Sequence, residues 1–536
     1  MGFQRIWGRP AGPAVGLVMA LFVAACAPEP VPGKLGPVEG FAGLVAADEP
    51  RAAVVGREVL GNGGTAIDAA VAMYFTMAVT MPSRVGLGGG GVCVMFDRAQ
   101  KKAEAIEFLP RAAPSGGIVP AGTRAMAALH ARSGSVRWEQ LLIPAENLAR
   151  FGHAVSRAFA RDLAAGARTV NARPELREIF TARSGRLATT GDKIVQPELS
   201  TVLSGIRRQG AAYVHGGAFA ARLAEASTAA GMPLSVEDIR ASLPRLVEAV
   251  SVPALKRDVA YFSPPRASAG IVAAQIWGAL TRVEDYEGAD NGERDHLFAE
   301  TVQRAFSQRA AWSLPDGSSA EPLEALVEEE RLERIMAGYD PARHTPAAAL
   351  SPVPESISVQ SPSAGFVAAD QFTKAIACNF TLNRLFGAGR VAPGTGVILA
   401  APPRSMTDGS TSIAAVVIGN TATGDVRFAG VGGIGPVGTT ALARMMLDTV
   451  IREETLENVM KQPRMHTHGT PDVLLHELTF AEEARAALLS RGHELRIVPA
   501  IGQVNAIYCP LGLKDHPEDC EVASDPRGHG LAQVAQ

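Results

Sequence analysis

The sequence has almost no excess of either charge. Its 51 lysine and arginine residues nearly balance its 54 aspartate and glutamate residues, which gives a formal net charge of -3 at pH 7. A protein that binds nucleic acid through its charge carries a basic excess, so nothing here indicates a nucleic-acid partner. Aromatic residues are also scarce, at 5%, whereas 55 glycines, 36 prolines and 47% hydrophobic residues fit a large, loop-rich globular protein.

The first apolar run of the chain is too short to span a bilayer comfortably. This run, AVGLVMALFVAA at 14–25, follows Arg5 and Arg9 and ends directly before Cys26. A basic start followed by a short apolar stretch is the layout of a secretory signal peptide. The residues VAAC resemble a bacterial lipobox, whose cysteine is lipidated and becomes the mature N-terminus. We predict a lipoprotein signal peptide at 1–25; the alternative is an ordinary signal peptide cleaved nearby.

A proline-rich segment follows the predicted lipid anchor. Residues 26–45 include APEPVPGKLGPVEG and are expected to form an extended tether. A lipid on Cys26 would hold the chain to a membrane of the bacterial cell envelope, and we expect the chain to face the periplasm.

Cysteine is also scarce, with five residues in the whole chain. Cys509 and Cys520 flank the turn-rich segment PLGLKDHPED, and in an oxidising compartment they could form a disulfide that staples a hairpin. Sequence alone does not fix the pairing. Cys93 and Cys378 lie in apolar strand patterns, so we expect them to be buried thiols.

A glycine-rich segment invites comparison with dinucleotide-binding proteins. Gly86, Gly88 and Gly91 spell G-x-G-x-x-G. That fingerprint requires a strand before the glycines and a helix after them. Here an apolar helical run precedes the glycines and a strand-like run follows, so we reject a dinucleotide site.

The rest of the chain changes its periodicity once. From 120 to 330 apolar residues recur at helical spacing, and 313–360 reads as an exposed, proline-spotted connection. Strand-like runs such as GFVAAD, KAIACNFTL and SIAAVVIG follow it.

Ten segments resemble the gamma-glutamyltranspeptidase family in the expected order over nearly the whole mature chain. They include GGTAIDAAVAMYFTMAVTMPSRVGLGGGGVCVMFD, FGAGRVAPGTGVIL, FAGVGGIGP and ASDPRGHGLA. The resemblance implies the α/β (α+β) fold of the N-terminal nucleophile hydrolases, a four-layer αββα sandwich. It also implies a precursor that cuts itself into a large-subunit-like region, 46–362, and a small-subunit-like region, 363–536, which form one intertwined unit.

The family register assigns a catalytic group. Asp370 matches the last residue of the family's Thr-Thr-His-[FY]-S-V-V-D, which places Ser363 at the position of the N-terminal nucleophile. A hydroxyl is a weak nucleophile, and a free α-amine can act as its base. The resemblance further gives Thr381 and Asn383 as the Thr-x-Asn support for the nucleophile and the substrate amino group. It gives Gly432 and Gly433 as the oxyanion-hole glycines.

The substrate-binding positions depart from the family pattern. Ser405 matches one of the paired serines that hold the substrate carboxylate, and Arg404 replaces the other. Arg111 lies one residue beyond the family's carboxylate-binding arginine. The family's acidic lid segment is missing, and Asp408 is the candidate to replace its aspartate. Pro362 precedes the nucleophile. Its ring restricts the backbone at the peptide bond between Pro362 and Ser363, which the precursor must strain in order to cleave it.

Other readings of these residues stay open. One alternative is that Ser363 is an ordinary loop serine, because serine and proline are common in turns and the local sequence is SPS. Another is that Ser361 is the nucleophile. His466, His468 and His476 lie close together in sequence, as the ligands of a metal would. The family carries histidines in this region without a metal, so we expect neither a metal nor a cofactor.

Two functions fit the sequence. The first is an envelope lipoprotein that transfers or hydrolyses a γ-glutamyl or related acyl amide, such as glutathione, through an N-terminal serine formed by self-cleavage. Its small-molecule pocket would be altered. The second is an unprocessed, non-catalytic relative that acts as a tethered binding or scaffold protein. We favour the first, because the Thr-x-Asn and paired glycines are retained.

Overall fold

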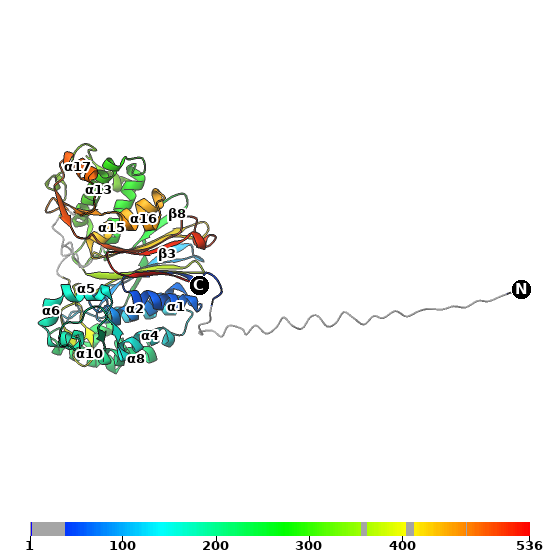
Figure 1. Cartoon of the computed structure of the whole chain (residues 1–536), viewed down its shortest axis with the longest axis vertical. Coiled ribbons are helices and arrows are strands. Elements are labelled where there is room, and N and C mark those ends of the chain that lie inside the picture. Colours follow the sequence, from blue (N-terminus) through cyan, green and yellow to red (C-terminus); the bar gives the residue numbers. More distant parts are fainter. Residues whose placement is uncertain (1, 3–37, 268, 355–361, 404–411, 468) are drawn as a thin grey trace.

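The fold is described by a computed structural model that covers residue 2 and residues 38–267, 269–354, 362–403, 412–467 and 469–536. Two antiparallel sheets lie face to face, and a layer of helices covers the outer face of each (Figure 1). This is the predicted αββα sandwich. No helix within the described ranges combines the length and the apolar character needed to cross a membrane.

The first sheet has seven strands. Their spatial order is β20 (Leu531–Ala535), β1 (Gly43–Ala47), β9 (Ser363–Asp370), β10 (Ala375–Thr381), β2 (Gly90–Asp97), β3 (Lys102–Phe108) and β6 (Arg245–Glu248). Strands from the regions before and after residue 363 are interleaved in this sheet. β9 and β10, from the later region, lie between β1 and β2, from the earlier region.

The second sheet has six strands. Their order is β19 (Glu521–Ser524), β18 (Gln503–Tyr508), β14 (Val426–Gly433), β13 (Ala414–Asn420), β8 (Asp258–Phe262) and β7 (Val250–Pro253). Small ladders lie outside the two sheets: β4 (His153–Ala154) with β5 (Lys193–Ile194), β11 (Val391–Ala392) with β12 (Val397–Ile398), and β15 (Met465–His466) with β16 (Leu474–Glu477) and β17 (Leu495–Val498).

The helices divide between the two outer faces. Those that share a hydrophobic core with the seven-stranded sheet are α1 (Pro50–Gly61), α2 (Ala66–Thr80), α3 (Gly122–Ser133), α4 (Trp138–Phe151), α5 (Arg157–Ala165), α6 (Ala167–Asn171), α7 (Pro174–Phe180), α8 (Pro197–Gln209), α9 (Ala212–His215), α10 (Ala218–Ala229) and α11 (Val236–Ala241). Those that share a core with the six-stranded sheet are α12 (Ala269–Gly278), η1 (Ala279–Val283), α13 (Asn291–Trp312), η2 (Glu324–Leu326), α14 (Glu329–Met336), α15 (Pro436–Met446), η4 (Leu447–Ile451), α16 (Leu456–Lys461) and α17 (Glu482–Ser490). Two short turns, η3 (Ala347–Ala349) and η5 (Pro517–Asp519), complete the set.

The layers explain why β9 has so little polar character. Its side chains alternate: Ala364, Phe366 and Ala368 face the helical layer, whereas Val367 and Ala369 face the other sheet. A strand buried on both faces needs apolar residues at every position. The sequence SAGFVAAD is therefore the pattern expected of a central strand in a four-layer fold.

Helix α2 is buried on all sides and begins at a defined cap. All of its residues are buried. Thr65 and Asp68 form a capping box at its N-terminus. The Asp370 carboxylate, at the end of β9, accepts a hydrogen bond from the Ala66 N–H at 2.8 Å. The helix that covers the centre of the first sheet is thus fixed to the strand that begins at Ser363.

Candidate active site

Ser363 lies where the two sheets meet, as the first residue of β9. It is completely buried and pairs across the ladder with Thr381 of β10. Its Oγ accepts a hydrogen bond from the Ile434 N–H at 3.0 Å, and Ile434 follows the last residue of β14 in the other sheet. The hydroxyl oxygen is therefore held in a defined position by a backbone donor.

The carbonyl group before Ser363 is held by a second donor. The Thr381 hydroxyl donates to the Pro362 carbonyl oxygen at 2.9 Å, and Thr381 Oγ1 accepts from the Asn383 N–H at 2.8 Å. The carbonyl of Pro362 belongs to the peptide bond that self-cleavage at Ser363 would break. A hydrogen bond to that oxygen stabilises negative charge developing on it.

Asn383 has a conformation suited to its residue type. Its φ is +64°, a left-handed conformation that asparagine tolerates better than most residues. Its Nδ2 donates to the Ala401 carbonyl at 2.8 Å. Thr381 and Asn383 are thus brought to the same end of the sheet as Ser363, and Asn383 fixes the chain that precedes residues 404–411.

The two glycines predicted for the oxyanion hole differ in their surroundings. A Cβ on Gly433 would lie 3.4 Å from the Ser363 carbonyl oxygen, whereas a Cβ on Gly432 would lie 2.3 Å from the Gly438 carbonyl oxygen. Gly433 thus borders Ser363, and Gly432 has to be glycine because α15 packs directly against it. The N–H that contacts Ser363 Oγ comes from the next residue, Ile434.

Ile434 was not found by sequence reasoning. Its φ is +70°, which is rare for a β-branched residue and costs about 1–3 kcal/mol. Such strain persists only where surrounding structure imposes it, and it is common in functional sites. No sequence pattern marks an isoleucine for this conformation, so only its place directly after the two glycines could have drawn attention to it.

Arg84 is a second residue that sequence reasoning missed. It is buried, and its Nη1 donates to the Ser363 carbonyl oxygen at 3.2 Å and to Gln503 Oε1 at 2.9 Å. Asp162 pairs with it through two hydrogen bonds, of 2.7 and 2.5 Å. Burial lowers the pKa of Arg84, but the charge of Asp162, its hydrogen bonds and the charge of Asp48 together outweigh burial, so the pKa rises. The guanidinium therefore stays charged beside Ser363.

Asp48 closes the other side of the nucleophile strand. Its Oδ2 accepts from the Gly365 N–H at 2.8 Å, and its Oδ1 accepts from Asn505 Nδ2 at 2.9 Å. Burial raises the pKa of Asp48, while these hydrogen bonds and the charge of Arg84 oppose the rise. We call Arg84, Asp162, Gln503, Asp48 and Asn505 the Arg84 network. It ties Ser363 and Gly365 to both sheets.

Of the predicted carboxylate-binding residues, Arg111 lies within the described part of the chain. Arg111 is exposed and follows β3, which lies three strands from β9 in the sheet. Burial lowers its pKa, with a further contribution from Arg266, while Glu107 opposes the shift. Arg404, Ser405 and Asp408 lie outside the described residues, as do Ser361, Cys26 and His468.

Of the three histidines that could have formed a metal site, the two that the structure describes, His466 and His476, do not converge on one point. His466 pairs with Leu475 and His476 pairs with Met465 in the β15–β16 ladder, so the two imidazoles point to opposite faces. His466 Nδ1 is 2.8 Å from Thr440 Oγ1, and His476 Nδ1 is 3.0 Å from the Glu477 carbonyl oxygen. Each ring thus has a separate local partner.

One prediction about cysteine was wrong. Cys93 and Cys378, expected as buried thiols, form a disulfide. The two residues face each other in the β2–β10 ladder, with Cα atoms 4.1 Å apart. Sequence reasoning placed each in a strand but could not give the register between strands 285 positions apart. A second disulfide joins Cys509 and Cys520.

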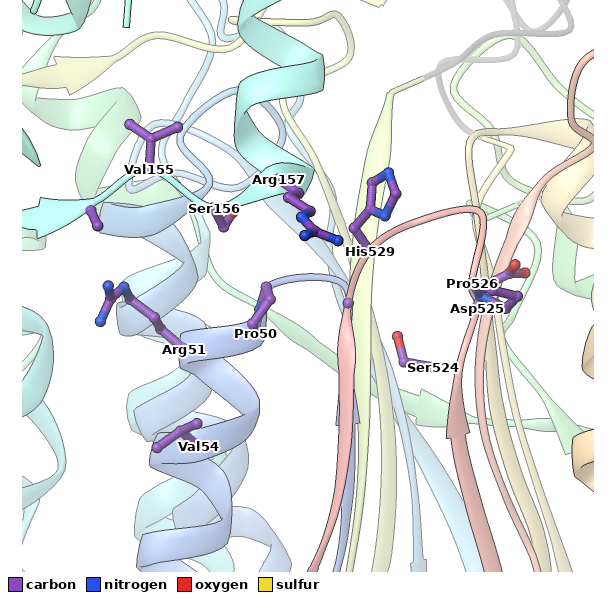
Figure 2. Close-up of a pocket in the computed structure, with 12 residues that line it drawn as sticks. Pro50, Arg51, Val54, Val155, Ser156, Arg157, Ser524, Asp525, Pro526 and His529 are labelled. Atoms are coloured by element: carbon purple, nitrogen blue, oxygen red, sulfur yellow. The ribbon is translucent and has the colours of Figure 1, made fainter. Parts of the chain in front are cut away.

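A cavity of about 620 Å³ lies on another side of the Arg84 network. Figure 2 shows that its lining comes from the start of α1, the start of α5 and the loop before β20, including Arg51, Arg157 and His529. It reaches Asp525, whose charge acts on Asp48. Ser363 is not among its lining residues, so we do not assign it to the substrate of Ser363.

Comparison with known proteins agrees with this geometry. The sandwich, with a buried serine at the start of a central strand, defines the fold class of the N-terminal nucleophile hydrolases. Cephalosporin acylase from Bacillus halodurans has the same fold, with a TM-score of 0.77 and 20% identity over 94% of this chain and 98% of that one. The gamma-glutamyltranspeptidase family model matches residues 52–117 and 115–535, and the chain belongs to this family of amide hydrolases and transferases.

Relatives of known name are distant but extend over most of the chain. Glutathione hydrolase 3 of Arabidopsis thaliana is 26% identical over 520 residues, which covers 86% of this chain and 79% of the relative. Acylase ACY 1 proenzyme of Pseudomonas sp. (strain V22) is 24% identical, covering 90% of this chain and 93% of the relative. Both hydrolase and acylase names therefore occur among the similar proteins.

Proposed function

We propose that this protein cuts its own chain between Pro362 and Ser363 and then uses Ser363 to transfer an acyl group from an amide to water or to an amine. One observation carries the proposal: in the uncut chain Ser363 Oγ and the Pro362 carbonyl oxygen each have a dedicated donor, Ile434 N–H at 3.0 Å and the Thr381 hydroxyl at 2.9 Å. Nucleophile and scissile carbonyl are adjacent and separately held.

The self-cleavage follows from these contacts. Ser363 Oγ forms a bond to the Pro362 carbonyl carbon, and the Thr381 hydroxyl stabilises the negative charge on the carbonyl oxygen. The carbon–nitrogen bond then breaks, and the nitrogen takes up the proton that the hydroxyl gives up. Water hydrolyses the resulting ester, which leaves a carboxylate on Pro362 and a free amine on Ser363.

The freed amine supplies the base for later turnovers. An α-amine has a pKa of about 8, so a useful fraction is neutral near pH 7 and can accept the hydroxyl proton. Ser363 Oγ then attacks the substrate amide, the amine part leaves, and the acyl-enzyme passes its acyl group to water or to an acceptor amine. We expect the oxyanion donors to come from this segment, where the Ile434 N–H lies 3.0 Å from Ser363 Oγ and Gly433 is its neighbour.

The substrate is an acyl amide carrying a γ-glutamyl group or a related acyl group. The names of the relatives, glutathione hydrolase and acylase, support this range. The departures at Arg404 and Arg111 favour an acyl pocket different from that of the glutathione hydrolases. The alternative is a non-catalytic scaffold, and it requires the chain to stay uncut.

The protein acts at the cell envelope, held by a lipid on Cys26. The signal-peptide pattern at 1–25 and the VAAC motif support this location. The two disulfides are further support, because disulfides persist in oxidising compartments. Replacing Cys26 by alanine is expected to move the protein from the membrane fraction to the soluble fraction. Retention in the membrane fraction would contradict the anchor.

The test of the enzyme proposal is intact mass and N-terminal sequencing of the mature protein. We expect two chains, the second beginning at Ser363, and a γ-glutamyl or acyl-amide substrate turned over by that form. Ser363→Ala is expected to give one uncut chain, whereas Ser363→Thr and Ser361→Ala are expected to be cut. A wild-type protein that stays uncut under all conditions overturns the proposal in favour of a scaffold.

A further inference from the structure

The Cys93–Cys378 disulfide crosses the proposed cleavage point. Cys93 belongs to β2, from the region before Ser363, and Cys378 belongs to β10, from the region after it. The bond between Pro362 and Ser363 lies between the two cysteines in sequence. Breaking that bond therefore places the two half-cystines on different chains.

The second disulfide differs in this respect. Cys509 and Cys520 are 11 positions apart, and both follow Ser363. A cut at Ser363 leaves this pair within one chain. The protein thus contains one disulfide that can join two processed chains and one that cannot, which gives a matched internal control.

The position of Cys93–Cys378 protects it from reduction. Both cysteines are fully buried, and β10 and β2 are the fourth and fifth strands of the seven-stranded sheet. Their side chains belong to the core beneath the helical layer, together with Phe366, Phe380 and residues of α2. A thiolate must reach a sulfur atom to exchange with it, so reductants have no path to this bond in the folded protein.

We infer that the mature protein is a covalent heterodimer, whose two chains remain joined by the disulfide between Cys93 and Cys378. The inference rests on the proposed self-cleavage. The bond forms when the two thiols lose two electrons and two protons to a disulfide oxidant of the envelope, which becomes a dithiol. Cleavage then adds one water molecule and releases neither chain.

The disulfide between the two chains changes how the cleaved protein reassembles after denaturation. Two chains held by non-covalent contacts separate on dilution or denaturation, and their reassembly depends on concentration. A covalent link makes reassembly intramolecular, at an effective concentration that dilution does not change. The processed protein is therefore expected to refold from denaturant with a yield independent of its concentration.

The test is electrophoresis and intact mass of the full-length protein, with free thiols blocked by N-ethylmaleimide before denaturation. Without reductant we expect one species, with the mass of the uncut chain plus one water. With reductant we expect two chains. Cys93→Ala/Cys378→Ala is expected to give two separate chains without reductant, whereas Cys509→Ala/Cys520→Ala is expected to give one joined species.

The outcomes separate this inference from the proposed function. Wild-type chains that separate without reductant overturn the covalent link and leave self-cleavage standing. A single chain with reductant overturns self-cleavage. In that event a site-specific protease sequence inserted in 355–361 provides the cut, and the same comparison applies. Alkylation of Cys93 or Cys378 in the denatured, unreduced protein also overturns the link, even if the double variant fails to fold.

Discussion

Two groups of buried or partly buried polar side chains differ in what they touch. The Arg84 network reaches the backbone of the proposed nucleophile, at Ser363 and Gly365. The other group lies beside α13. His344 Nδ1 is 2.6 Å from Glu300 Oε1, and His344 Nε2 is 3.1 Å from Asp472 Oδ1. We call these three residues, with His296 and His493, the His344 network.

The His344 network joins separate segments of the helical layer. His296 and Glu300 are four residues apart on α13, and His296 Nδ1 lies 2.8 Å from His493 Nε2 in the turn after α17. Its described contacts hold α13 to the 340–347 segment and to the segment around Asp472. One network therefore has a means to affect chemistry at Ser363 and the other has a means to affect stability alone, and substitutions can separate the two.

Replacing Arg84 is expected to have the largest effect. Arg84→Gln leaves the buried Asp162 carboxylate without its positively charged partner, with only the Ser83 hydroxyl still donating to it at 2.6 Å among the contacts described. The loss should lower the free energy of unfolding by about 3–5 kcal/mol. It also frees the Ser363 carbonyl, so self-cleavage should slow. Denaturant unfolding and the rate of chain cleavage measure the two effects. A decrease in the free energy of unfolding below about 1 kcal/mol would show that the Arg84–Asp162 pair contributes little to stability. A double-mutant cycle with Asp162→Asn would measure the interaction energy between the two residues.

Replacing Thr381 should affect chemistry far more than stability. Thr381→Val keeps the shape but removes the donor to the Pro362 carbonyl, and loss of one oxyanion donor costs about 10²–10³ in rate. Thr381→Ser keeps the hydroxyl and is expected to retain most of the cleavage rate. The rate of appearance of the Ser363 N-terminus is the measurement. Equal rates for valine and serine variants would remove Thr381 from the mechanism.

Replacing Glu300 should affect stability and its pH dependence but leave cleavage unchanged. Burial lowers the pKa of His344, but the hydrogen bonds and charges of Glu300 and Asp472 together outweigh burial and raise it, and Glu300 makes the larger contribution of the two. This contribution is fully present below pH 6.5 and is lost as the pH rises through the raised pKa. Glu300→Gln should cost about 1.5–3 kcal/mol near pH 6 and less at higher pH.

Urea unfolding between pH 6 and pH 9 measures this difference, with chain cleavage followed in parallel. A variant that unfolds with the same pH profile as the wild type would show that Glu300 is not the source of the His344 shift. A variant that folds but is not cut would give the His344 network a role at Ser363 and abolish the contrast between the two networks.

The smallest effect is expected at Gly433. A Cβ there meets the Ser363 carbonyl oxygen at 3.4 Å, an ordinary contact, so Gly433→Ala should change the free energy of unfolding by less than about 0.5 kcal/mol. Gly432→Ala forces a 2.3 Å contact with Gly438 and should cost about 1–3 kcal/mol. Thermal unfolding of the two variants compares them. If Gly433→Ala were the less stable of the two variants, the start of α15 would have to move aside for the new Cβ more easily than the strand that begins at Ser363.

Much of the fold could be predicted from the sequence, because motif order along the chain is preserved within the family. Ser363, Thr381 and Asn383 follow from counting residues between Asp370 and the TLN segment. Arg84 and Asp48 could not be found in this way. They contact Ser363 or Gly365 from 279 and 317 positions away. Arg84 lies within the first family-like segment, but nothing in that segment relates it to Ser363, and Asp48 lies outside the quoted segments.

The same limit explains the cysteines. An alternating or continuous apolar run gives the identity of a strand but not its neighbour, and a shift of one residue in register would turn Cys93 and Cys378 to opposite faces. Ile434 was missed for a different reason. Its conformation is imposed by packing of the segment between β14 and α15, which no local propensity for isoleucine predicts.

The pairing of β1 with β20 bears on when the proposed cleavage can take place. Gly43 pairs with Ala535, so the first described strand of the sandwich finds one of its partners at the very end of the chain. The donor to Ser363 Oγ likewise arrives 71 positions after the serine. A chain under synthesis has neither contact until both partner segments have been made. The proposed cut therefore depends on assembly: we expect a chain to divide at Ser363 only after the segment that follows β14 has packed against the serine.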